Sequence, residues 1–262
     1  MRQATATAQA TATAQATERA PGADSADARA MGGLALRFSN VVALSGGFPV
    51  LTGVDLQVQV GSICWLAGAN GAGKTSILRV AAGLLQPASG TAEVLGMNLR
   101  SDLPAVRAAV GLLSHQSGMY EELSVAENLQ FWGRACGAKN SEIAASLRRA
   151  EVSQRLEPVP FAQLSSGQRR RVSLAAMLVK RATLWCLDEP HAGMDAPGRD
   201  LVDGLLLEAR DSGVTTLIAS HDADRVASLA TDRVWVQGGA ISSDSGLSEG
   251  QTTTSNNGPA EP

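Results

Sequence analysis

The 262-residue chain contains no long apolar run. Its longest apolar stretches, such as ATLWCL at 182–187, end after about six residues, whereas a membrane-spanning helix needs roughly 20. The first 30 residues also lack an apolar segment of the signal-peptide type. We therefore expect a chain that neither crosses a bilayer nor carries a secretion signal.

The chain also lacks a basic excess and a cysteine framework. Its formal net charge is −3, with 22 Lys and Arg against 25 Asp and Glu. Because nucleic-acid binding depends on neutralising phosphates with basic side chains, nucleic acid is not an expected partner. The three cysteines, Cys64, Cys136 and Cys186, lie far apart without metal-ligand spacing. This pattern indicates buried thiols in a reducing compartment.

Both ends of the chain are poor in core-forming residues. Residues 1–31 form an Ala/Thr/Gln-rich repeat without Leu, Ile, Val or aromatic residues, and residues 243–262 are rich in Gly, Ser and Thr. Such segments bury too little apolar area to offset their chain entropy, so we predict two disordered tails around one domain at 32–242. Met31 directly precedes the first strand-like run and is an alternative start of translation, which the mass of the native N-terminus would test.

Between the tails, short apolar segments alternate with helical ones. In VDLQVQV at 54–60 the apolar side chains fall on one face of a predicted strand. The nearly continuous apolar runs ICWLA, TLWCLDEP and VTTLIAS are typical of a parallel sheet covered on both faces. A helical period dominates about 119–175, where Ser124 and Glu127 have the spacing of a capping box. The pattern predicts an α/β fold with a helical insert.

GANGAGKT at 68–75 has the form of a phosphate-binding loop between a strand and a helix. Glycine lets backbone amides approach the phosphates closely, and the helix that starts near Lys74 points its positive end at the same anion. We expect Lys74 to contact the β and γ phosphates of a nucleotide and Thr75 to hold Mg²⁺. The predicted nucleotide-binding residues are Gly68, Ala69, Asn70, Gly71, Ala72, Gly73, Lys74, Thr75 and Ser76.

Kinases, GTPases and recombinases share such loops, so a second motif must identify the reaction. The apolar run ATLWCL is followed by two adjacent carboxylates, Asp188 and Glu189. An Asp at the end of a strand beside the loop can organise Mg²⁺, while the next carboxylate can orient and deprotonate an attacking water. This separate role for Glu189 favours a hydrolase over a kinase, whose acceptor would occupy the place of the water.

With these motifs the chain resembles the ATP-binding subunit of an ABC transporter over about residues 34–241. GANGAGKT, Gln116 after VGLLSH, LSSGQ, LWCLDEP, HAGMD and the His of IASHD occur in the order of that family. The resemblance implies a P-loop ATPase core with a mixed or parallel sheet, an N-terminal antiparallel β part and a helical insert. It further implies that Gln116 senses Mg²⁺ and the water, that Asp195 belongs to the D-loop, and that His221 is the switch residue of the catalytic site.

The LSSGQ turn at 164–168 gives the resemblance its clearest mechanistic consequence. Ser165 and the amides around Ser166 and Gly167 precede a helix, so together with Gln168 they are expected to form an anion site. The γ-phosphate of a facing subunit would occupy this site, which implies a head-to-tail dimer, most simply a homodimer, with two sandwiched ATP molecules. The RRR run at 169–171 is interpreted as a solvated helix face rather than a nucleic-acid patch.

Within the family, the chain is similar to the ATPase of the haem-exporter type of cytochrome c biogenesis system. The His-Gln-x-Gly arrangement at 115–118, the compact insert that follows it and Trp185 before the Asp-Glu pair carry this similarity. It implies a peripheral subunit on the cytoplasmic face of a bacterial membrane, bound to separate permease subunits that handle the cargo. The family often stacks an aromatic residue on adenine, but Ser45 stands at that position and Phe48 follows three residues later. We therefore expect weak base selectivity.

Other functions stay open at this point. One alternative is the ATPase of a drug, peptide or lipid exporter, and another is a non-transport ABC ATPase that acts on ribosomes or nucleic acid. Non-transport members usually carry tandem cassettes, long insertions or basic tails, whereas this chain has one cassette, a short insert and an acidic balance. A stand-alone P-loop kinase would leave the LSSGQ turn unexplained.

Overall fold

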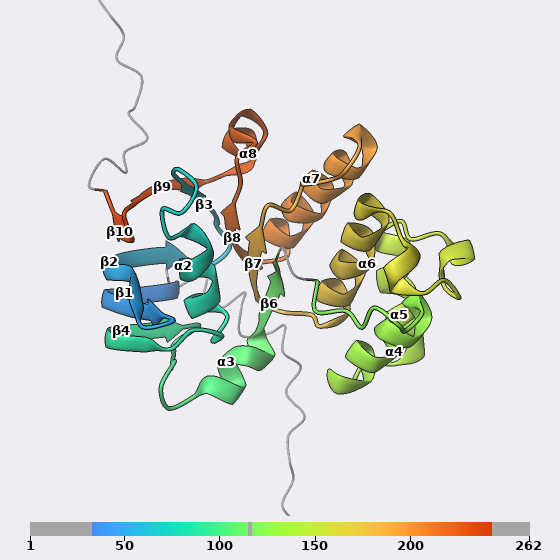
Figure 1. Cartoon of the computed structure of the whole chain (residues 1–262), viewed down its shortest axis with the longest axis horizontal. Coiled ribbons are helices and arrows are strands. Elements are labelled where there is room, and N and C mark those ends of the chain that lie inside the picture. The colour runs from blue at the N-terminus through green and yellow to red at the C-terminus, as the bar shows by residue number, and fades with distance from the viewer. Residues whose placement is uncertain (1–32, 115–116, 243–262) are drawn as a thin grey trace, which may run out of the picture.

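The computed structural model describes residues 33–114 and 117–242 (Figure 1). The two predicted tails, 1–31 and 243–262, lie outside the described residues, and so does Gln116. The predicted domain limits, 32–242 with a helical part at about 119–175, stay a prediction.

The first sheet is antiparallel and comes almost entirely from the N-terminal part of the chain. In β2, the buried side chains of Val54, Leu56 and Val58 alternate with exposed Asp55 and Gln57, as predicted. Such alternation suits a sheet with one face on the core and the other in water. The strand order is β2-β1-β4-β5, with β1 at Leu34–Ser45, β2 at Phe48–Gln59, β4 at Pro87–Val94 and β5 at Met97–Asn98.

The second sheet has six strands, of which five run parallel and β10 pairs antiparallel to β9. All residues of β3 and β8 are buried, which accounts for their continuous apolar sequences. The order is β10 (Ala240–Ile241), β9 (Asp232–Gln237), β3 (Ile63–Ala67), β8 (Thr215–Ala219), β7 (Leu184–Asp188) and β6 (Val110–Leu113).

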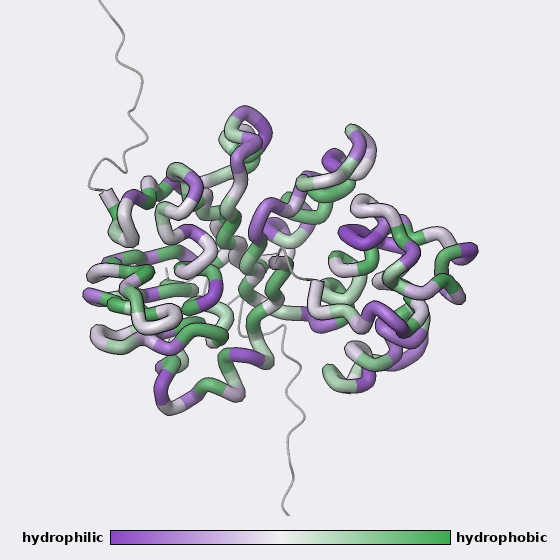
Figure 2. Tube along the Cα trace, viewed as in Figure 1, coloured by the Kyte–Doolittle hydropathy of each residue, from purple (hydrophilic) through white to green (hydrophobic). Residues whose placement is uncertain are grey.

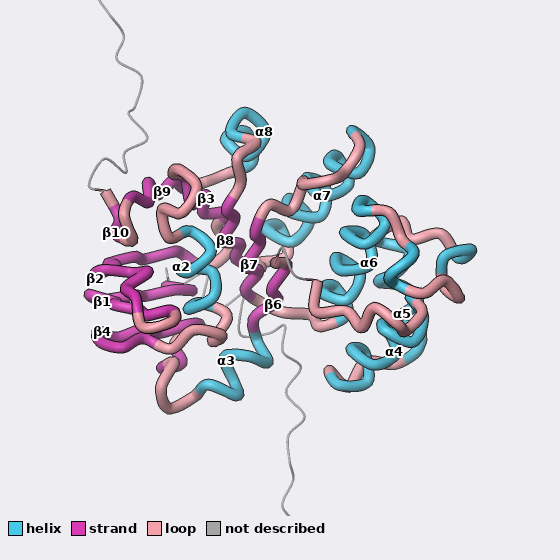
Figure 3. Tube along the Cα trace, in the orientation of Figure 1, coloured by secondary structure: helices cyan, strands magenta, loops and turns pink. Residues whose placement is uncertain are grey.

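Helices α4, α5 and α6 pack on one another in a lobe beside the sheets (Figures 1 and 3). At the start of α4, the Ser124 hydroxyl accepts from the Glu127 amide at 3.2 Å and Glu127 accepts from the Ser124 amide at 2.8 Å, which confirms the predicted capping box. The helices are α2 (Lys74–Ala81), α3 (Leu103–Ala109), α4 (Val125–Ala135), α5 (Asn140–Arg149), α6 (Ser166–Val179), α7 (Ala196–Asp211) and α8 (Ala223–Leu229). With both sheets, they confirm the predicted fold class.

Two hydrophobic clusters lie on opposite faces of the six-stranded sheet. In β3, Trp65 packs into the cluster shared with the helical lobe, whereas Cys64 and Leu66 pack into the cluster shared with α2 and the antiparallel sheet. The hydrophobic colouring in Figure 2 accordingly runs through the central strands. Because both faces are covered, the strand ends are the accessible parts of this sheet.

The prediction of three buried thiols is wrong for one of them. Cys64 and Cys186 are buried, but Cys136 is exposed at the C-terminal end of α4. Burial raises the pKa of the Cys64 thiol to about 12, and it also raises the pKa of Cys186. The two buried thiols are therefore protonated at neutral pH and chemically inert.

Candidate functional site

The predicted phosphate loop connects β3 to α2, and its backbone requires glycine at two positions. Gly68 has φ +143°, and a Cβ atom there would lie 2.2 Å from the Val236 carbonyl oxygen. Gly73, the N-cap of α2, has φ +113°. Side chains rarely adopt such angles, so the sequence sets the shape of this loop through its glycines.

The N-terminus of α2 has no side-chain cap. Within the described residues, no hydrogen bond is made by the backbone amides of Gly71, Gly73 and Lys74. The Lys74 side chain is 7% exposed, and its Nζ donates to the carbonyls of Gly68 at 2.7 Å and Ala69 at 2.9 Å. The loop thus gathers a buried ammonium group and unpaired amides at the positive end of a helix, an arrangement that suits an anion.

Thr75 and Asp188 meet although 113 residues separate them in sequence. The Thr75 hydroxyl donates to Asp188 Oδ2 at 2.8 Å, because α2 begins beside the carboxyl end of β7. A hydroxyl and a carboxylate are hard oxygen donors of the kind that Mg²⁺ prefers, and this ion usually takes its remaining ligands from phosphate and water. The two side chains therefore fit a Mg²⁺ ion bound together with a nucleotide.

Glu189 follows β7 in the left-handed region of the backbone, with φ +49°. Its Oε2 accepts from the His221 amide at 3.2 Å and from the Ser220 hydroxyl at 3.3 Å, while His221 Nε2 lies 3.5 Å from Oε1. A non-glycine residue in this conformation is strained and persists only where its surroundings hold it. The carboxylate is thereby fixed between the ends of β7 and β8.

These groups line one cavity of about 500 Å³ at the carboxyl ends of the parallel strands. In open α/β sheets this is the usual place for ligands. Phe48 is 76% exposed and does not line the cavity. Weak base selectivity therefore stays a prediction. The lining comprises Pro49, Val50, Asn70, Gly71, Ala72, Gly73, Lys74, Thr75, Ser76, Asp188, Glu189, His221, Gly238 and Gly239.

The LSSGQ turn at 164–168, called the signature turn from here on, lies outside this cavity. Ser165 caps α6: its hydroxyl accepts from the Gln168 amide at 3.3 Å, and Gln168 Oε1 accepts from the Ser165 amide at 2.9 Å. None of the residues from Ser165 to Gln168 lines the cavity, and Figure 1 shows α6 and α2 on opposite sides of β7 and β8. The chain does not bring its own signature turn to its own phosphate loop.

Asp195 is also placed outside the cavity, at the N-cap of α7. Its Oδ1 accepts from the Gly198 amide at 3.0 Å and lies 3.9 Å from Arg171. In the segment between Glu189 and Asp195, the Gly193 carbonyl accepts from the Ser166 hydroxyl at 3.5 Å. The segment after β7 therefore packs directly against the signature turn.

Arg170 corrects the interpretation of the RRR run as a solvated face. Its guanidinium turns inward from α6 to the backbone at the end of β7, and burial lowers its pKa. Sequence patterns could not reveal this, because three consecutive arginines leave open which of them faces the core.

Two further contacts, one at the phosphate loop and one between the segment after β7 and helix α7, were not predicted from the sequence. The Gly239 amide donates to the Ala72 carbonyl at 2.8 Å, so the turn between β9 and β10 braces the phosphate loop. His191 is 4% exposed, and its Nε2 lies 2.9 Å from Asp203 Oδ1 on α7. The HAGMD motif contains this histidine, but nothing in its spacing indicates that the ring is buried.

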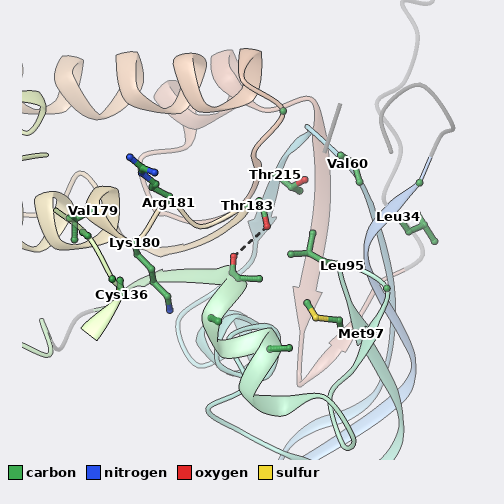
Figure 4. A pocket seen from close by; sticks show the side chains of 18 of the residues that line it. Leu34, Val60, Leu95, Met97, Cys136, Val179, Lys180, Arg181, Thr183 and Thr215 are labelled. Carbon is green, nitrogen blue, oxygen red and sulfur yellow. Dashed lines mark hydrogen bonds between the residues drawn. The ribbon is translucent and has the colours of Figure 1, made fainter. Parts of the chain in front are cut away.

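A second cavity, of about 820 Å³, lies at the amino ends of β7 and β8 (Figure 4). Thr183 and Thr215 mark these strand ends, and Cys136 and Lys180 lie on the side of the helical lobe. Its apolar lining includes Leu34, Val60, Leu95, Met97 and Val179. The cavity at the carboxyl ends of the strands is lined by polar and charged groups, whereas this cavity at their amino ends has a mainly apolar lining.

The chain matches a family model described as ABC transporter over residues 51–192. It is 37% identical over 191 residues to the cytochrome c biogenesis ATP-binding export protein CcmA of Cupriavidus pinatubonensis, an alignment that covers 72% of this chain and 84% of the relative. The protein of the same name from Rhodopseudomonas palustris is 39% identical over 176 residues, which cover 67% of this chain and 86% of the relative.

Solved structures show the same fold. A dimeric ATP-binding cassette in a post-hydrolysis state, bound to ADP and Pi, has a TM-score of 0.71 at 22% identity and covers 79% of this chain and 96% of its own. An ATP-binding subunit of an ABC transporter has a TM-score of 0.72 at 23% identity and covers 79% of this chain and 87% of its own.

Proposed function

The chain belongs to the ABC transporter family and is an ATP-hydrolysing subunit of the transporter type. From this premise we propose that it powers a haem-exporter-type complex for cytochrome c biogenesis. The observation that carries the chemistry is the convergence of Lys74, Thr75, Asp188, Glu189 and His221 on one cavity. The relatives named for cytochrome c biogenesis export support the assignment of the complex.

Within one subunit, we assign each group a separate task. Lys74 and the amides of its loop would hold the β and γ phosphates, and Thr75 and Asp188 would hold Mg²⁺, which supplies positive charge against the phosphates. Glu189 would take a proton from the attacking water, because its carboxylate is fixed beside the phosphate loop. His221, 3.5 Å from that carboxylate, would orient it and contact the γ-phosphate. Gln116 keeps its proposed role as sensor of the ion and the water.

We assign the remaining tasks to a second copy of the chain. Ser165, Ser166, Gly167 and Gln168 would meet the γ-phosphate held by the facing subunit, since they do not line the cavity of their own chain. Asp195 lies beside this turn and would accompany it across the interface. The proposed assembly is a head-to-tail homodimer with two ATP molecules between the subunits.

The permease is proposed to be a separate subunit. In the ranges 33–114 and 117–242, no helix has the length and apolar character that a membrane crossing requires. We place the ATPase on the cytoplasmic face of a bacterial membrane, attached to permease subunits that handle the cargo. The ATPase domain would span 32–242, with its helical part at about 119–175.

The Glu189→Gln variant tests this function in cells. A strain that lacks the gene should lose haem-stained c-type cytochromes, and the wild-type gene should restore them. Glu189→Gln should fail to restore them, because loss of a general base lowers the hydrolysis rate by about 10²- to 10⁴-fold. The matched control is Glu208→Gln, an exposed residue that pairs with Arg149 away from the cavity.

Three outcomes would contradict the proposal. Normal c-type cytochromes in the deletion strain would exclude the proposed complex, and the export assay would then turn to drugs, peptides and lipids. Full restoration by Glu189→Gln would remove its role as base. Association with ribosomes that nuclease abolishes, with no membrane protein co-purifying in detergent, would exclude a transport function.

A further inference from the structure

Arg170 connects helix α6 to the carboxyl ends of β6 and β7. From the second turn of α6 its half-buried side chain reaches the end of β7 and the end of β6. The guanidinium donates to four backbone carbonyls: Ser114 at 2.9 Å, Asp188 at 2.6 Å, Glu189, and Pro190 at 3.2 Å. Three of these carbonyls are consecutive in sequence and surround the proposed catalytic base.

Few side chains other than arginine can make this set of contacts. The guanidinium is planar and carries five N–H donors in a fixed fork, whereas an amide side chain offers two. Burial lowers the pKa of Arg170, and the charges of Asp188 and Glu189 oppose that effect. Removing the guanidinium would take a charged donor from each of these carbonyls, and hydrogen bonds to charged groups are stronger than neutral ones.

The backbone at this point needs support. Glu189 has φ +49°, a conformation that non-glycine residues keep only where neighbouring contacts impose it. One such contact is the hydrogen bond from the Glu189 amide to the Ala219 carbonyl at 2.8 Å. Two further contacts hold the carbonyl of the same residue, which accepts from the Arg170 guanidinium and from the Ala192 amide at 3.1 Å.

We propose that Arg170 is a positioning residue for Glu189, an inference that rests on the proposed ATPase function. By holding the peptide units of 188–190, it keeps the Glu189 carboxylate against His221 and the phosphate loop. The Ser114 carbonyl ties the strand that leads to Gln116 to the same guanidinium. Arg170 lies on the helix that Ser165 caps. The signature turn, which would contact the ATP of the partner subunit, is therefore connected mechanically to Glu189, the proposed base for the ATP of its own subunit.

The chain offers a matched control at the other end of the same helix. Lys180, the C-cap of α6, is also half-buried, and its Nζ donates to the carbonyls of Arg107 at 2.5 Å and Val110 at 2.6 Å. Burial lowers its pKa as well. Figure 4 shows Lys180 beside the apolar cavity, at the amino end of the sheet. Lys180→Gln therefore removes a comparable structural contact on the side away from the phosphate loop.

The test compares the full-length wild-type chain with Arg170→Gln, Arg170→Lys and Lys180→Gln. For each we would measure kcat for ATP hydrolysis, Kd for the fluorescent analogue mant-ATP, and Tm. Arg170→Gln should lower kcat on the order of 100-fold, the effect of misplacing a catalytic group by about 1 Å, with Kd unchanged because the Lys74 loop is untouched. Arg170→Lys keeps the charge and should give an intermediate kcat. Lys180→Gln should lower Tm alone.

The results separate this proposal from a general stabilising role. Equal kcat in wild type and Arg170→Gln would overturn it, and so would equal losses of kcat in Arg170→Gln and Lys180→Gln. If Arg170→Gln does not fold, Arg170→Lys decides: a lower kcat at unchanged Kd supports the role, and a wild-type kcat overturns it. A wild-type chain without ATPase activity would instead contradict the proposed function itself.

Discussion

The N-termini of α2 and α6 are both suited to phosphate, but their local structures differ. At α2, Gly73 provides no side-chain cap, and the amides of Gly71, Gly73 and Lys74 have no partner within the part of the chain that the structure describes. At α6, Ser165 and Gln168 form a complete capping box. The first helix end therefore needs a ligand to satisfy its amides, whereas the second satisfies part of its own.

This difference matches the two proposed roles. A loop that binds ATP within its own subunit gains affinity from unpaired amides and from the buried ammonium of Lys74. The signature turn would be exposed to solvent until a second subunit binds, and its own capping box stabilises it in that state. The Ser165 hydroxyl would exchange its bond to the Gln168 amide for one to phosphate when the dimer closes.

Among variants that compare the two helix ends, the largest effect should come from Ser165→Arg, which would fill the proposed anion site of α6 with bulk and charge. Loss of preorganised donors at a reacting centre typically lowers kcat by about 10²- to 10³-fold. Binding of mant-ATP should be unchanged, because the α2 loop is intact. Ser153→Arg is the control, at an exposed serine that precedes a short 3₁₀ helix in the same lobe. Wild-type kcat in Ser165→Arg would remove the sandwich model.

A smaller effect, on binding, should come from Lys74→Ala at the α2 end. Removing one charge-assisted contact to phosphate costs about 1.5–3 kcal/mol, which corresponds to a loss of affinity of about 10- to 100-fold. Titration with mant-ATP measures it, and Lys139→Ala at an exposed position is the control. An unchanged Kd would contradict the assignment of the loop.

The sequence predicted the parts of the fold and of the site that depend on local chemistry. The glycines of the phosphate loop, the buried strands β3 and β8, and the cap at Ser124 follow from spacing within a few residues. Arg170 and the Gly239 contact to Ala72 were not predictable, because each depends on how distant elements pack. Strand β4 escaped for a similar reason: PASGTAEV is rich in small and polar residues, and its pairing with β1 defines it as a strand.

The smallest effect should come from Ser165→Ala, which removes the cap alone. Loss of an N-cap hydroxyl costs about 1 kcal/mol of stability, and Ser124→Ala removes the equivalent cap from α4. Both variants should show similar decreases in the free energy of unfolding, measured by urea denaturation. Only Ser165→Ala should also lower kcat. Equal kcat values in the two variants would mean that the hydroxyl at 165 serves the helix and not the phosphate.

The central claim is that the α2 loop of one copy and the α6 turn of another complete a single ATP site. The direct measurement is the specific rate of ATP hydrolysis by the purified full-length chain across a dilution series that passes from dimer to monomer. The account predicts that the rate per chain falls steeply as dimers dissociate, in step with the dimer fraction seen by light scattering. A constant rate per chain down to the monomeric range would contradict it.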